Sequence, residues 1–137
     1  MNDTSIQLVR ETFHLVEPIA PQAAAMFYAN LFAVDPSLAP LFKGDMAAQG
    51  HRLMQMIALA VSQLDEPATL MPALAQLGRR HAGYGVREGH YDTVGGALLA
   101  TLRQGLGVAF TPEVNEAWTE VYGVIASTMK AAGRLPA

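Results

Sequence analysis

The sequence contains no cysteine among its 137 residues. A disulfide framework, a zinc site built on thiolates and a cysteine nucleophile are therefore excluded, and any bound metal must use other ligands. Charge is also scarce, because charged residues make up 15% of the chain and nine basic against twelve acidic groups give a net charge of -3. Since no basic stripe could neutralise phosphates, we expect no nucleic-acid partner.

Long hydrophobic runs are missing as well. No apolar stretch approaches the roughly twenty residues that span a bilayer, and Asp3, Glu11 and Glu17 interrupt the first segment with a charge pattern that is wrong for a secretory signal. We therefore expect a cytoplasmic protein with no membrane partner. The length fits one domain over residues 1–137, which we expect to be a monomer or a weak homodimer.

What is present is apolar and helical in pattern. Apolar residues make up 51% of the chain, and they recur at helical spacing, whereas no stretch alternates with the period of a strand. Thr4 and Gln7 are typical of a capping box. The sequence thus predicts an all-α fold. Helices are expected over about 4–17, 21–34 and 46–64, with a short helical turn before Phe42, and a further helix should begin between 67 and 72 and end at 83. Two long helices follow: one carries Val94, Leu98, Leu102 and Leu106, and the last begins after Thr111 and Pro112.

Two helical stripes are apolar except for one polar member each. Gln49 precedes Leu53, Met56, Ile57 and Ala60, and His81 follows Leu70, Leu74 and Leu77. Burying an amide or an imidazole without a partner costs about 1–3 kcal/mol. Either residue alone is explained by an ordinary core histidine bonded to a carbonyl, or by a glutamine at the edge of a stripe.

A flat apolar cofactor between these two helices would explain both residues at once. His81 would then donate its neutral imidazole to a metal, and its other ring nitrogen would bond to the carbonyl of Leu77, one turn earlier. That bond would fix the tautomer and the plane of the ring. His51 lies two positions from Gln49, about 200° around the helix, so we expect it at the surface.

Further residues form an ordered set along the chain: the run from Phe27 to Phe32, Pro36 followed six positions later by Phe42, the run from Leu77 to His81 with Gly85 and Val86, His90 with Tyr91, and Ala117 with Trp118. This set resembles bacterial single-domain globins and the haem domains of flavohaemoglobins. The resemblance implies a globin fold of six to eight helices around a pocket for haem b, iron protoporphyrin IX.

The resemblance also implies roles for individual residues. The histidine that matches His81 is the proximal iron ligand, the phenylalanine that matches Phe42 lies against the porphyrin, and the residues that match Tyr28, Gln49 and Leu53 line the gas side. Further expected contacts to the haem are Arg52 and Arg80, as partners of its propionates, and Leu77, Val86, Tyr91, Val94 and Tyr122.

One position departs from the family's pattern. Flavohaemoglobins have a glutamate late in the last helix that supports the proximal histidine, and the matching residue here is Gly133. Without that carboxylate we expect a milder proximal ligand and little peroxidase-like activity.

The implied function is binding of O2, NO and CO. Hydrogen bonds from Tyr28 and Gln49 would favour O2, whose bound form carries partial negative charge, and slow release suits reaction with NO to give nitrate. The sequence contains no G-x-G-x-x-G fingerprint, so turnover would need a separate reductase.

Three other interpretations remain open. The chain could be a gas sensor, or an electron-transfer b-type haem protein in which Met54 or Met56 joins His81 as a ligand. It could also be an interaction module that has lost its cofactor, although His81 and the small alanine residues argue against that.

Overall fold

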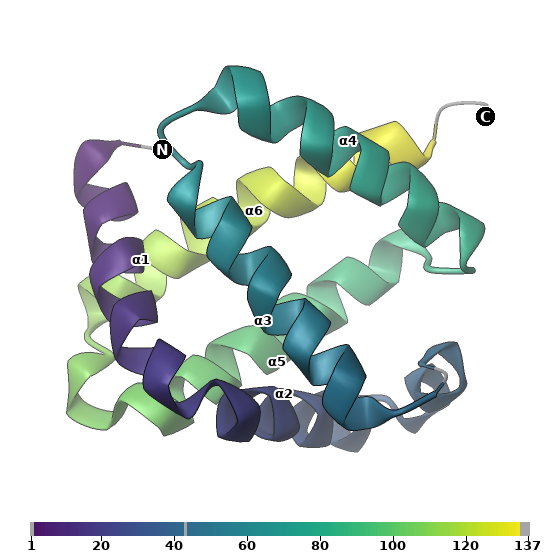
Figure 1. Cartoon of the computed structure of the whole chain (residues 1–137), viewed down its shortest axis with the longest axis horizontal. Helices are drawn as coiled ribbons and strands as arrows, with labels where there is room; N and C mark the ends of the chain where they lie inside the picture. The colour runs from purple at the N-terminus through teal and green to yellow at the C-terminus, as the bar shows by residue number, and fades with distance from the viewer. Residues whose placement is uncertain (1, 43, 135–137) are drawn as a thin grey trace.

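The computed structural model describes residues 2–42 and 44–134, and within these ranges it contains helices and no strand. This confirms the all-α prediction. No helix in the described ranges combines the length and hydropathy needed to cross a membrane. The elements are α1 (Asp3–Val16), η1 (Glu17–Ile19), α2 (Ala20–Val34), η2 (Pro36–Leu41), α3 (Met46–Ser62), α4 (Pro67–Gly83), α5 (Glu88–Leu106), η3 (Gly107–Ala109) and α6 (Pro112–Gly133), where η denotes a short 3-10 helix (Figure 1).

Most helix ends lie where the capping residues predict them. The Thr111 side chain accepts a hydrogen bond from the Val114 backbone N–H and Pro112 opens α6, as expected. The capping box at Thr4 and Gln7 is wrong, because α1 begins one residue earlier and Asn2 accepts the bond from the Ser5 N–H. Asparagine is among the most favoured N-cap residues, so the helix begins after Asn2 and not after the threonine two positions later.

The helices do not all pack against one another equally. The most extensive pairs are α4 with α6, α2 with α5 and α1 with α6, while α3 lies on α2 and α1. Figure 1 shows α4 crossing α6 and α3 crossing in front of α5. Although α3 and α4 are consecutive, they do not form a closely packed pair within the described residues. Among the described residues, the extensive contacts of α3 are therefore with α1 and α2, and those of α4 are with α6.

The core consists of two apolar clusters. The larger cluster contains residues of all six α-helices and includes Phe13 and Trp118, whose ring centroids lie 6.4 Å apart. The smaller cluster includes Phe27, Tyr28 and Leu31 of α2. Leu98 of α5 packs against both clusters, so α5 connects the two halves of the core.

A buried hydrogen bond joins α1 to α6 and should contribute measurably to stability. The Trp118 indole N–H donates to Thr12 Oγ1 at 2.8 Å, and both residues are buried. Thr12→Val keeps the shape but leaves the indole N–H unpaired, so we expect the free energy of unfolding to fall by about 1–3 kcal/mol. Urea denaturation measures this loss. Thr12→Ser, which keeps the hydroxyl, is the control, and equal stability of the valine variant and the wild type would contradict the assignment.

Candidate functional site

Two neighbouring stripes of α4 have different surroundings. Leu70, Leu74 and Gly78 recur every fourth residue and are buried on the helix that packs against α6. Leu77 and His81 belong to the adjacent stripe and are only half-buried. One stripe of α4 thus packs against α6, and the adjacent stripe, which contains the histidine, stays partly exposed.

The geometry of His81 fixes the chemical form of its ring. Its Nδ1 lies 2.9 Å from the Leu77 carbonyl oxygen, which confirms the predicted bond. Because a carbonyl can only accept, Nδ1 carries the proton and Nε2 carries a lone pair. Nε2 has no hydrogen-bond partner within the described residues. Burial lowers the pKa of His81, against an opposing effect of the Leu77 bond and with a small contribution from Arg80, so the ring is in the neutral form that metals bind.

Tyr28 of α2 lies in an aromatic group with Phe32 and Phe42. The Tyr28 ring centroid lies 5.3 Å from that of Phe42, at the end of η2, and 5.9 Å from that of Phe32. Burial raises the pKa of Tyr28, and the nearby charge of Arg52 partly opposes this. The phenol therefore stays protonated at neutral pH and can donate a hydrogen bond.

A close crossing of α2 and α3 brings the start of α3 to this tyrosine. Gly50 is buried, and a Cβ atom placed on it would lie 2.8 Å from Ala24 Cβ and 3.9 Å from Tyr28 Cε2. The two helices can approach this closely only because residue 50 has no side chain. Gln49, the adjacent residue, is half-buried and lies at the same end of α3.

Most of the predicted contact residues share an unusual kind of burial. They are large apolar or aromatic side chains that pack against a core cluster and yet stay partly exposed. Well-packed cores bury such side chains, so their partial exposure fits the walls of a site for a flat apolar molecule. On the cluster with Tyr28 they are Phe42, Leu53 and Val94, and on the larger cluster they are Leu77, Val86 and Tyr122.

The other predicted residues have different surroundings. Tyr91 is buried rather than partly uncovered, and its backbone carbonyl accepts a hydrogen bond of 2.6 Å from the Tyr122 hydroxyl. Arg52 and Arg80 are exposed and form no ion pair within the described part of the chain. Both guanidinium groups are therefore available to an anionic group.

The remaining histidines and one methionine lie outside the predicted haem contacts. His51 is exposed, as predicted. His90 caps α5, since its Nδ1 accepts a hydrogen bond from the Arg87 backbone N–H. The prediction that Met56 lies on the inward stripe of α3 is wrong, because its side chain is 40% exposed. Leu98, one turn after Val94, packs against both core clusters and was not among the predicted contact residues, although its helical spacing from Val94 was a usable signal.

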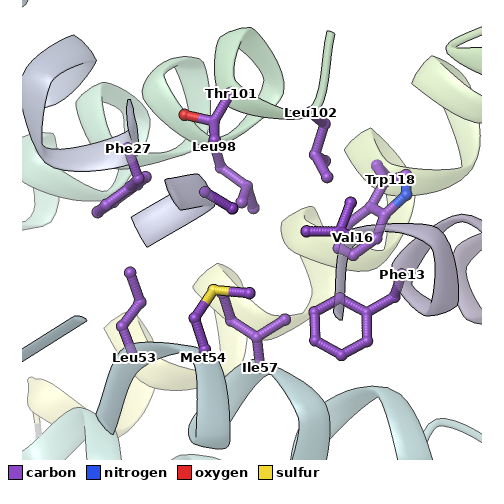
Figure 2. Close-up of a pocket in the computed structure, with 11 residues that line it drawn as sticks. Phe13, Val16, Phe27, Leu53, Met54, Ile57, Leu98, Thr101, Leu102 and Trp118 are labelled. Carbon is purple, nitrogen blue, oxygen red and sulfur yellow. The ribbon is translucent and has the colours of Figure 1, made fainter. Parts of the chain in front are cut away.

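An apolar cavity of about 20 Å³ lies behind Leu53. Figure 2 shows Leu53, Met54 and Ile57 of α3 pointing into it from one side and Leu98 and Leu102 of α5 from the other. It is far too small for a macrocycle, and the polar groups of Thr101 and Trp118 at its wall already donate to Ala97 and Thr12. Such a dry space suits a small apolar molecule.

The donor set fits a haem. A neutral imidazole with one fixed nitrogen and partly uncovered apolar side chains are what a protein needs to hold an iron porphyrin, and exposed arginines and a protonated phenol are compatible with it. Within the described residues no group of three or more His, Asp or Glu side chains is arranged to hold a bare metal ion.

Comparison with known proteins agrees with this geometry. The globin family profile matches residues 25–129. Flavohemoproteins of Chromobacterium violaceum and Rhodopirellula baltica are 30% and 33% identical over 94% and 92% of this chain, which spans about a third of their length.

Solved structures agree as well. An engineered carbene transferase, from a candidate nitric oxide dioxygenase of Rhodothermus marinus, aligns with a TM-score of 0.86 and 25% identity over 97% of this chain and 93% of that one. A Malassezia yamatoensis flavohemoglobin with bound FAD and heme aligns with a TM-score of 0.80 and 25% identity over 97% of this chain and 36% of that one. The chain belongs to the globin family.

Proposed function

We propose that this chain holds haem b between α3 and α4 and uses it to combine NO with O2. The observation that carries the proposal is the fixed, neutral imidazole of His81, with its Nδ1 bonded to the Leu77 carbonyl and its Nε2 lone pair available. When bound, the haem would supply an iron atom that takes O2, NO or CO and exchanges one electron.

His81 would be the protein's ligand to that iron. The Leu77 carbonyl holds the ring plane and keeps the proton on Nδ1, so no rearrangement is needed before Nε2 donates. Phe42, Leu53, Leu77, Val86, Val94 and Tyr122 would supply apolar contact to the macrocycle, with Tyr91 behind Tyr122. Arg52 and Arg80 would pair with the two propionates.

Tyr28 and Gln49 would act on the gas. The Tyr28 hydroxyl is protonated because burial raises its pKa, and both it and the Gln49 amide can donate to a partly negative oxygen atom. A hydrogen bond to a charged acceptor contributes about 1.5–3 kcal/mol. These donors would therefore retain O2 in preference to CO, which carries little charge.

Long retention favours a reaction on the gas over its delivery. NO, O2 and one electron give nitrate: the O–O bond breaks and both oxygen atoms become bonded to the nitrogen of NO. The bound haem would supply the electron, and a separate reductase would restore it. The apolar walls exclude water, and the cavity behind Leu53 could hold the second gas molecule close by. The Rhodothermus marinus relative supports this assignment.

Nitrate formation tests the proposal directly. The haem-loaded protein is reduced, equilibrated with O2 and mixed anaerobically with one equivalent of NO. We expect about one nitrate per protein, because the electron balance permits a single turnover without a reductase. The variant in which exposed Gln55 is replaced by leucine is the control and should behave as the wild type. NO loss without nitrate, or nitrate at the level of free haemin, would reject dioxygenation and leave gas sensing or electron transfer.

A further inference from the structure

Helices α4 and α6 meet backbone to backbone one turn before His81. Gly78 is buried there, and a Cβ atom placed on it would lie 2.3 Å from the Met129 carbonyl oxygen and 2.6 Å from Met129 Cα. Real Cβ atoms do not approach other atoms so closely. Because the neighbouring atoms belong to the backbone of α6, no side-chain rotation could relieve the contact, and one of the helices would have to move.

A second glycine faces the same crossing from α6. A Cβ atom on Gly133 would lie 3.3 Å from Ala82 Cβ and 3.4 Å from the Gly78 carbonyl oxygen. Ala82 is the residue after His81, so the two close approaches bracket the histidine. Helix α6 is also the one helix with which α4 packs extensively in the described part of the chain. The distance between the axes of α4 and α6 is therefore set at this crossing.

The histidine ring moves with its own helical turn. Its Nδ1 is bonded to the carbonyl of Leu77, the residue next to Gly78, so the ring is fixed relative to the backbone that touches α6. If that turn is pushed away from α6, the Nε2 atom moves with it, because the bond to the Leu77 carbonyl restrains rotation of the ring.

We infer that Gly78 is a positioning residue for the proximal ligand. Because it has no side chain, α4 can approach α6 closely enough to place His81 Nε2 correctly for iron. The inference rests on the proposed haem site. Gly133 serves the same crossing with a wider margin, since the contacts of a Cβ atom there would be about an ångström longer.

Gly78→Ala is the direct test, read by the iron–histidine stretching frequency in resonance Raman spectra of the ferrous protein. We expect that frequency to shift and the loss of haem to an excess of apomyoglobin to become about tenfold faster, which corresponds to about 1.4 kcal/mol. Forced overpacking of a helix contact commonly has an effect of this size. Adding Met129→Ala should not reverse the change, because the obstructing atoms are backbone.

Two controls separate positioning from a general loss of stability. Gly83 lies in the same helix, and a Cβ atom added to it would have no atom within 4 Å, so Gly83→Ala should leave both measurements unchanged. Gly50→Ala overpacks the α2–α3 crossing instead, and it should lower the melting temperature without shifting the iron–histidine frequency. The same shift in Gly50→Ala and Gly78→Ala would overturn the inference.

Gly133→Ala keeps the inference testable if Gly78→Ala does not fold. Its contacts of 3.3 and 3.4 Å predict a smaller shift in the same direction, and an unchanged frequency in this variant would overturn the inference. The proposed function fails by a different outcome, namely a wild-type protein that binds no haem through His81. A wild type that binds haem normally, with no response to substitution at the crossing, would reject only the role of Gly78.

Discussion

Replacing His81 by alanine is expected to reduce haem affinity by at least about 100-fold and to shift the Soret band. Loss of a residue that merely orients a metal ligand costs about 10- to 100-fold, so loss of the ligand itself should cost no less. Titration of the purified apoprotein with haemin, followed by absorbance, measures the affinity. Because the substitution leaves a space the size of the ring, added imidazole should restore the spectrum.

His51→Ala is the matched control for this experiment. His51 is exposed on α3, and it lies on the far side of that helix from Gln49. Its removal should change neither the affinity nor the spectrum. If the His81→Ala spectrum matched that of the wild type, the iron would have another protein ligand, and both the haem geometry and the inferred role of Gly78 would be wrong.

Tyr28→Phe and Gln49→Leu are each expected to speed the release of O2 by roughly 10- to 150-fold, the equivalent of about 1.5–3 kcal/mol. The phenylalanine keeps the ring contacts with Phe32 and Phe42, whose centroids lie 5.9 and 5.3 Å away, so the change isolates the hydroxyl. Stopped-flow displacement of O2 by excess CO measures the rate.

CO provides an internal comparison, since it carries little charge and should leave all variants at similar rates. Gln55→Leu places the same substitution on an exposed position of α3 and should release O2 like the wild type. Unchanged O2 release in both Tyr28→Phe and Gln49→Leu would show that retention does not depend on these donors. Equal acceleration of O2 and CO would indicate a wider pocket instead of lost hydrogen bonds.

Features that depend on one helical turn could be predicted from the sequence. The bond from His81 to the Leu77 carbonyl joins residues four apart on one helix, so the spacing alone places the two atoms within reach. The start of α6 at Thr111 and Pro112 is equally local. The all-α architecture follows from the same periodicity, because 3.6-residue spacing fills every long segment.

Features that depend on contacts between helices could not be predicted from the sequence in the same way. Met56 matches the apolar period of α3, but exposure is decided by what covers each side of that helix, and the methionine is 40% exposed. The approach of Gly78 to Met129 joins two distant segments, and no local pattern encodes it. The bond from the Tyr122 hydroxyl to the Tyr91 carbonyl is likewise a product of the α5–α6 packing.

The packing of α4 against a single helix has a consequence for assembly of the protein. A segment held along one side loses fewer contacts when it opens than a segment surrounded on all sides. Within the described residues the extensive contacts of α4 are with α6, so separation of this one pair would leave the contacts among α1, α2, α5 and α6 in place. If haem binds beside His81 as proposed, the bound macrocycle would add contacts to the partly uncovered stripe of α4 that holds Leu77 and His81.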